Sequence, residues 1–169
     1  INMRDNPTFR DETLHFFLEH APIMGSIALK YFQNLENEDI ADKADHLHDP
    51  LTKADLEISD YIVNSVKPFQ KDMILLTEET SNSFSYSKQE LLNIRKPIWI
   101  IDELDGTLNF SQGLEHFSIL LGMAEHKQDN YEMTVGVIYK PLTGEFYFAT
   151  IGSDAIKQSR EGIETKLSV

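Results

Sequence analysis

The chain has 169 residues, of which 41% are hydrophobic and 25% charged, which suits one folded domain with its own core and excludes a disordered tail. Its formal net charge is −13, so nucleic acid and anionic membranes are not expected partners, and an anionic substrate would need cations in the site. The absence of cysteine excludes disulfides, thiolate nucleophiles and cysteine-based metal sites, and it is compatible with the cytoplasmic location that we expect.

The first part of the chain is expected to be mostly helical. Apolar residues recur at helical spacing from Thr13 to Tyr31 and predict an amphipathic helix, in which Pro22 marks a bend or a boundary. The acidic, aperiodic stretch from Asn34 to Pro50 predicts an exposed loop with at most a short strand. Lys53 to Val66 has the pattern of a second helix, which Pro68 closes.

The second part of the chain is expected to be mostly strand. Met73 to Leu76 and Ile98 to Ile101 are short apolar runs typical of buried strands, the second ending at Asp102, and Ser81 to Arg95 between them predicts polar loop and helix. Three antiparallel strands are predicted at residues 116–125, 133–140 and 144–150. Helices first and a meander later predict an α+β fold of layered helices and antiparallel sheet.

Carboxylates gather at the ends of these predicted elements, in TKAD at 52–55, TEET at 77–80 and IDELDGT at 101–107. The third segment is the most informative, because a hydrophobic strand has no packing reason to deliver Asp102 and Asp105 to its tip. Mg²⁺ binding supplies a reason, since this ion prefers oxygen ligands in octahedral geometry. Two acids spaced around a turn can hold adjacent ions, with one carboxylate bridging them.

Gly106 and Thr107 follow these acids directly. If a helix begins there, its first N–H groups point at the same spot and suit a phosphate group. Cations beside a helix start are what hydrolysis of a phosphate ester needs. Taken alone, Asp-Gly-Thr is also common turn chemistry, Asp55 could be first-turn helix charge, and Glu79 could be a solvated side chain.

Taken together, the motifs resemble those of the inositol monophosphatase family. DELDGTLNF at 102–110 resembles the family signature, and TEE at 77–79 resembles its upstream Glu-Glu motif. LTKAD at 51–55 resembles the opening of its second helix, and GVIYKPL at 136–142 with EFYFA at 145–149 resembles its following hairpin. The order and spacing match from about residue 50 to 169.

The resemblance implies a site with two to three Mg²⁺ ions. Glu78, Asp102 and the backbone carbonyl of Leu104 would hold one ion, Asp102 and Asp105 a second, and Glu78 would help to order a third. Members of the family are typically inhibited by lithium, so the same inhibition is expected here.

The resemblance also implies catalytic roles. Asp55 and Thr107 would orient and deprotonate the attacking water, with Glu78 as part of the catalytic group. Gly106 and Thr107 would bind the phosphate through their N–H groups, beside Asp105. Glu79 would contact the metal ligands rather than the ions themselves.

Two departures from the family pattern stand out. Glu103 takes the place of the usual proline, and we expect it to loosen the turn and to add a charge near the metals. The family also continues into a second α/β domain, giving αβαβα layers, which supplies another aspartate and most of the substrate pocket. Residues 1–169 are therefore expected to be the N-terminal α+β metal-binding domain, without the C-terminal domain.

These features predict a Mg²⁺-dependent phosphomonoesterase acting on inositol monophosphate or a related small sugar phosphate, and a homodimer. The runner-up is a 3′(2′),5′-bisphosphate nucleotidase, although Asn109-Phe110 favours the inositol branch. Ser in place of Thr107 would be expected of a fructose bisphosphatase. From another class, the chain could be a truncated, non-catalytic metal- or phosphate-binding module, or an interaction fragment with an exposed apolar face.

The remaining polar and aromatic residues are expected to be structural. His46, His48, His116 and His126 are interpreted as surface or core residues, because hard Mg²⁺ prefers oxygen. Trp99, within an apolar strand, is expected in the core.

Overall fold

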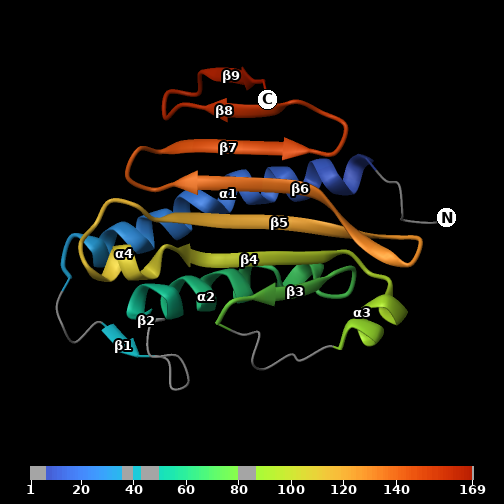
Figure 1. The fold of residues 1–169 in the computed structure, drawn as a ribbon, viewed down its shortest axis with the longest axis horizontal. Coiled ribbons are helices and arrows are strands. Elements are labelled where there is room, and N and C mark those ends of the chain that lie inside the picture. Colours follow the sequence, from blue (N-terminus) through green and yellow to red (C-terminus); the bar gives the residue numbers. More distant parts are fainter. Residues whose placement is uncertain (1–6, 36–39, 43–49, 80–86, 169) are drawn as a thin grey trace.

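The computed structural model describes residues 7–35, 40–42, 50–79 and 87–168, and it confirms the predicted α+β architecture. One mixed sheet carries two long helices on one face, and the order of the elements can be followed in Figure 1. The helical elements are α1 (Pro7–Phe32), α2 (Lys53–Ser65), the 3-10 turn η3 (Lys67–Phe69), α3 (Lys88–Ile94) and α4 (Thr107–Ser111). The strands are β1 (Ile40–Asp42), β2 (Pro50–Thr52), β3 (Ile74–Thr77), β4 (Ile98–Asp105), β5 (Ser118–Lys127), β6 (Asn130–Lys140), β7 (Glu145–Thr150), β8 (Ala155–Gln158) and β9 (Glu164–Leu167).

Helix α1 packs an apolar stripe against the sheet. It begins at Pro7, before the predicted start at Thr13, and Pro22 lies inside it without ending it. The apolar side chains of the stripe recur at intervals of three or four residues, which places them on one face of the helix. Four of them are fully buried: Phe17, Ala21, Met24 and Ala28.

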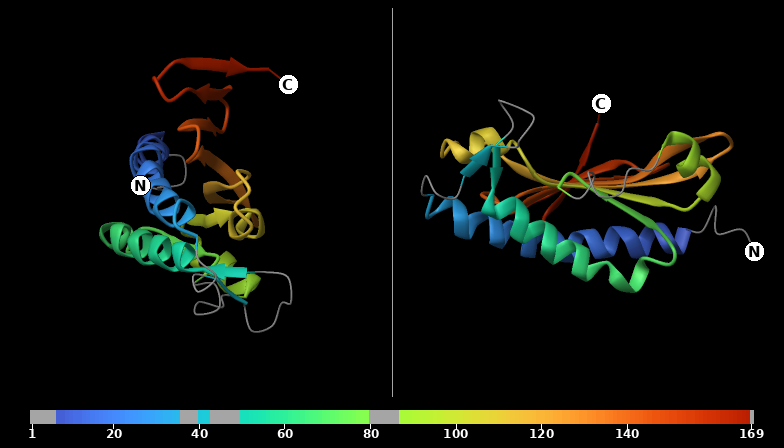
Figure 2. Two further views of the ribbon diagram at one scale, coloured as in Figure 1. Left: turned by 90° about the vertical axis from the view of Figure 1, so that its left-hand side faces the viewer. Right: turned by 90° about the horizontal axis from the view of Figure 1, so that it is seen from below.

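Helix α2 begins at a capping box formed by Thr52 and Asp55. The Asp55 N–H donates to Thr52 Oγ1 at 3.3 Å, and Asp55 Oδ2 accepts from the Thr52 N–H at 2.9 Å. This exchange satisfies two N–H groups that a helix start otherwise leaves unpaired. The two views of Figure 2 show α2 beside α1 on the same face of the sheet.

The larger sheet has the strand order β3-β4-β5-β6-β7-β8-β9. Strands β3 and β4 are parallel, and every later pair is antiparallel. The three predicted antiparallel strands are therefore confirmed as β5, β6 and β7. The parallel pair matters most for function, because it brings the carboxyl ends of β3 and β4 to the same edge of the sheet.

From Trp99 to Glu103, successive side chains of β4 alternate between the two faces of the sheet; at the irregularity that follows, Leu104 is buried in the core as well. Trp99 and Ile101 are buried in the core beneath the helices, as expected for Trp99, whose ring lies 5.0 Å from the rings of Phe16 and Phe17. Ile100 points to the other face and is 43% exposed. The expectation of a wholly buried strand was thus too simple, because an unbroken apolar run can still have one open side.

Several boundaries differ from the predictions. Strand β4 does not end at Asp102 but continues to Asp105, with an irregularity in its pairing to β5 between these residues. Strands β8 and β9 were not predicted, because they are short and every side chain of β9 is exposed. Within the predicted loop at 34–50, the described part contains β1, which pairs with β2. His46 and His48 lie outside the described residues.

In the described ranges, no helix combines the length and the hydropathy that crossing a bilayer requires.

Candidate functional site

The ends of β3 and β4 bring Glu78 and Asp102 together. Thr77 pairs with Ile101 in the parallel ladder, so the next residue on each strand is one of these two acids. The Glu78 N–H donates to the Ile101 carbonyl oxygen at 3.2 Å, which extends the ladder to the site. Two segments that are separated by more than twenty residues thus deliver carboxylates to one point, as the sequence predicted.

Asp102 is the most perturbed acid of this edge. Burial raises the pKa of Asp102 to about 7, and the negative charges of Glu78 and then Asp105 add to the rise. The Leu104 N–H, which donates to Asp102 Oδ1 at 3.1 Å, opposes the rise. The site therefore holds negative charge under repulsion, which a bound cation would relieve.

The turn after β4 fixes the next two predicted residues. Thr107 is buried, and its hydroxyl donates to the Leu104 carbonyl oxygen at 2.8 Å. Asp105 is exposed at the strand end, and its Oδ2 accepts from the Ser118 hydroxyl at 3.3 Å. The Leu104 carbonyl and the two aspartates are therefore arranged around one short loop.

Gly106 allows that turn. Its φ of +87° lies in the left-handed region, and a Cβ there would meet the His116 carbonyl oxygen at 2.6 Å. Helix α4 starts immediately afterwards, and the Phe110 N–H donates to the Gly106 carbonyl at 3.0 Å. A helix thus begins here, which was the condition for the expected phosphate site, although the helix has only five residues.

Asp55 and Glu79 have different surroundings. Asp55 is 1% exposed, and its Oδ2 caps α2 through the Thr52 N–H and hydroxyl. The catalytic role of Asp55 stays a prediction beside this capping role. Glu79 follows Glu78 after β3 and is half-buried. Strand β2, which leads into α2, packs beside α4, so the Asp55 and Thr107 segments are neighbours.

Glu103 does not lie in the turn where the family pattern suggested it. It lies inside β4, is 1% exposed and follows Trp99 and Ile101 on the core side of the strand. Its Oε2 accepts from the Glu78 N–H at 3.2 Å. Burial raises the pKa of Glu103 to about 6, while the hydroxyl groups of Ser59 and Thr77 and the Glu78 N–H limit the rise. The sequence analysis missed this position. The available signal was that Glu103 stands two residues after Ile101, so that both side chains lie on the same face if the strand continues.

The donor chemistry of the site suits a hard divalent cation. The carboxylates of Glu78, Asp102 and Asp105 and the carbonyl of Leu104 offer only oxygen atoms, which Mg²⁺ prefers. Within the described part of the chain, no three His, Cys, Asp or Glu side chains already form a ready-made metal cluster.

His116 and His126 stand apart from the acids. The His116 side chain is exposed. His126 is 8% exposed, and its ring packs edge-on against that of Tyr131, with 5.4 Å between their centroids. Both positions agree with the interpretation of these histidines as surface and core residues.

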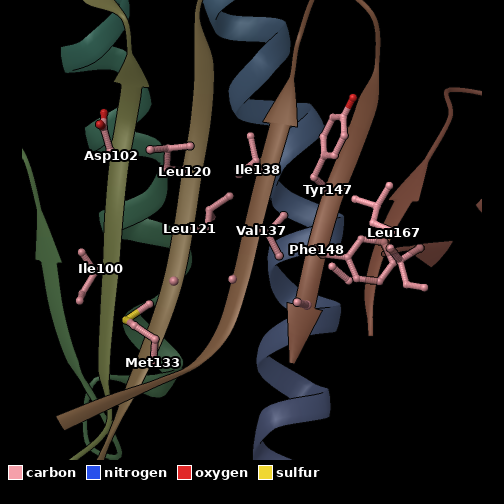
Figure 3. Close-up of a pocket in the computed structure, with 15 residues that line it drawn as sticks. Ile100, Asp102, Leu120, Leu121, Met133, Val137, Ile138, Tyr147, Phe148 and Leu167 are labelled. Carbon is pink, nitrogen blue, oxygen red and sulfur yellow. The ribbon is translucent and has the colours of Figure 1, made fainter. Parts of the chain in front are cut away.

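Asp102 also borders an apolar hollow on the sheet face opposite the helices (Figure 3). The hollow has a volume of about 490 Å³, and side chains from β4 to β9 line it. Tyr147 reaches it from β7, on the side opposite to the buried Phe146. The acid thus lies at the rim of a largely apolar surface.

Comparison with known proteins identifies related chains. The model of the "Inositol monophosphatase family" matches residues 10–168. A fructose-1,6-bisphosphatase/inositol-1-monophosphatase of Thermotoga maritima is 30% identical over 144 residues, which cover 85% of this chain and 50% of that protein. The 3′(2′),5′-bisphosphate nucleotidase CysQ of Aggregatibacter actinomycetemcomitans is 29% identical over 119 residues, which cover 70% of this chain and 41% of that protein.

Solved structures share the fold. The IMPase of Thermotoga maritima superposes with a TM-score of 0.68 at 27% identity, over 86% of this chain and 51% of that one. CysQ from Bacteroides thetaiotaomicron gives a TM-score of 0.65 at 26% identity, over 91% of this chain and 51% of that one. The chain spans about half the length of the curated relatives it matches.

Proposed function

The chain belongs to the inositol monophosphatase family, and from this premise we propose that it takes part in Mg²⁺-dependent hydrolysis of a small phosphate monoester. The observation that carries the proposal is the parallel pairing of β3 and β4, which brings Glu78 and Asp102 to the same edge of the sheet. An acid held under repulsion in an oxygen-rich site is a candidate metal ligand.

We assign the ligands residue by residue. Glu78, Asp102 and the Leu104 carbonyl would hold one Mg²⁺, and Asp102 and Asp105 would hold a second. When bound, such ions polarise the phosphoryl group and lower the pKa of a bound water. The carboxylates keep the ions in place, and the domain assignment of residues 1–169 as the metal-binding half belongs to the same proposal.

Thr107 and Asp55 would orient the attacking water. The Thr107 hydroxyl proton is directed to the Leu104 carbonyl, so the lone pairs of Oγ1 are available to accept a hydrogen bond from water. Asp55, held at the start of α2, would receive the water proton. The N–H groups of Gly106 and Thr107 would orient the phosphate, with Glu79 supporting Glu78.

The net charge of the chain also supports a cation-dependent reaction. At −13, the protein repels a phosphate ester unless bound cations reverse the local field. Inositol 1-phosphate is the first substrate to test, since a relative at 30% identity is named for that activity. Adenosine 3′,5′-bisphosphate is the second, because another relative is named as a bisphosphate nucleotidase.

The test is phosphate release by the full natural protein from these two compounds, with Mg²⁺ and with a chelator. Turnover of inositol 1-phosphate that requires Mg²⁺ would support the proposed function. Preference for the bisphosphate would keep the mechanism and change the substrate. Mg²⁺ binding without turnover of either compound would favour the non-catalytic alternative.

A further inference from the structure

Glu103 is a buried carboxylate at a position where core packing does not require a charged side chain. It occupies the position after Trp99 and Ile101 on the core face of β4, where an apolar side chain would fill the same space. A carboxylate in that environment is costly unless its oxygens are bonded. Local rules are most often broken at functional sites, so this residue needs an explanation beyond the core.

The one hydrogen bond of the Glu103 side chain goes to the segment that carries Glu78. Its Oε2 accepts from the Glu78 N–H, whereas its Oε1 is buried without a hydrogen-bond partner among the described residues. The Ser59 hydroxyl on α2 and the Thr77 hydroxyl on β3 are near enough to limit the rise of its pKa. One side chain of β4 thus holds the backbone just beyond the end of β3.

The Glu78 N–H is shared between two acceptors. The Ile101 carbonyl and Glu103 Oε2 each lie 3.2 Å from the nitrogen, at the long end of the usual range for an amide hydrogen bond. This backbone hydrogen bond joins the two segments directly after Thr77, where β3 ends. A second, charged acceptor there strengthens the point at which the strand would otherwise fray.

We propose that Glu103 is a positioning residue for the metal site, which holds the backbone of Glu78 against β4 and so fixes the Glu78 carboxylate relative to Asp102. The inference rests on the proposed function, because Glu78 and Asp102 are assigned there as ligands of one cation. Groups that hold metal ligands in place commonly matter for affinity nearly as much as the ligands themselves.

The experiment measures Mg²⁺ affinity by calorimetry in the full natural protein and in two variants. Glu103→Ala removes the acceptor, and we expect it to raise the Mg²⁺ Kd by about tenfold or more. Glu103→Gln retains an acceptor oxygen of the same reach, so its Kd is expected to stay within about threefold of wild type. Amide hydrogen exchange at Glu78 should accelerate about fivefold in Glu103→Ala relative to neighbouring amides, and should be restored in Glu103→Gln.

Glu125→Ala is the matched control. Glu125 is a second buried glutamate, 6% exposed and paired with Arg10, and it lies on β5 near the opposite end of β4, next to the Ala124–Ile98 pair. Its loss should lower the free energy of unfolding without changing the Mg²⁺ Kd. An unchanged Kd in Glu103→Ala, or a Gln variant as weak as the Ala variant, would overturn the inference. Absence of Mg²⁺ binding by the wild type would instead overturn the proposed function.

Discussion

Replacing Gly106 with alanine separates two physical effects at the turn that carries the site. The left-handed φ of +87° costs a residue with a Cβ about 1–2 kcal/mol. The new Cβ would also meet the His116 carbonyl oxygen at 2.6 Å and the Phe117 Cα at 3.3 Å, both backbone atoms that cannot rotate away. Forcing an atom into such a space costs about 1–3 kcal/mol. We expect Gly106→Ala to lower the free energy of unfolding by about 2–4 kcal/mol, once the gain of about 0.4–1 kcal/mol from a stiffer unfolded chain is counted.

Two other glycines serve as controls for this prediction. Gly113 has a φ of +72° but nothing within 4 Å of a Cβ, so Gly113→Ala should show the backbone cost alone, about 1 kcal/mol. Gly136, in β6, has neither a positive φ nor a close neighbour, so Gly136→Ala should be neutral or slightly stabilising. Urea denaturation gives the free energy of unfolding of all three alanine variants. A Gly106 variant no less stable than the Gly113 variant would refute the reasoning from the His116 contact.

Two further predictions concern the chemistry of the site. Thr107→Ala should slow turnover more than it weakens Mg²⁺ binding, and it should cost about 1 kcal/mol of stability, because the buried bond to the Leu104 carbonyl is lost; equal losses of turnover and binding in steady-state kinetics and calorimetry would show a structural role only. Mg²⁺ affinity should rise with pH up to about 7 and then level off, because the folded, metal-free protein holds a proton on Asp102 that the cation must displace. Below that pKa, calorimetric titrations should show about a tenfold loss of affinity per pH unit, whereas a flat profile would contradict the assignment. Since this pKa is raised above the ordinary value of 3.8, the metal-free protein should lose stability as the pH rises from about 4 to about 7.

Short-range patterns predicted much of the fold. Helical spacing identified α1 and α2, and short apolar runs identified β3 and β4, while the strand and turn pattern of residues 116–150 identified β5, β6 and β7. The capping box of Thr52 and Asp55 also starts α2 where the sequence indicated. Strands β8 and β9 escaped prediction, since their side chains are half-buried or exposed and they gain order from pairing with β7.

The site was predicted in part for the same reason. Its motifs stand at element ends, so the meeting of Glu78 and Asp102 follows from one parallel pair of strands. The burial of Glu103 did not follow, because the family pattern suggested a turn at that position, whereas the strand continues to Asp105. The two-residue spacing of Ile101 and Glu103 is visible in the sequence. It places both side chains on one face only if β4 is known to extend beyond Asp102.

The most direct test of the central claim is a calorimetric titration of Mg²⁺ into the full natural protein and into Asp102→Asn. The carboxylate of Asp102 is the proposed ligand that both ions share, so the variant, which keeps the size of the side chain but not its charge, should lose measurable Mg²⁺ binding while it stays folded. Wild-type affinity in a folded Asp102→Asn protein would contradict the claim that the acids at the ends of β3 and β4 form the metal site.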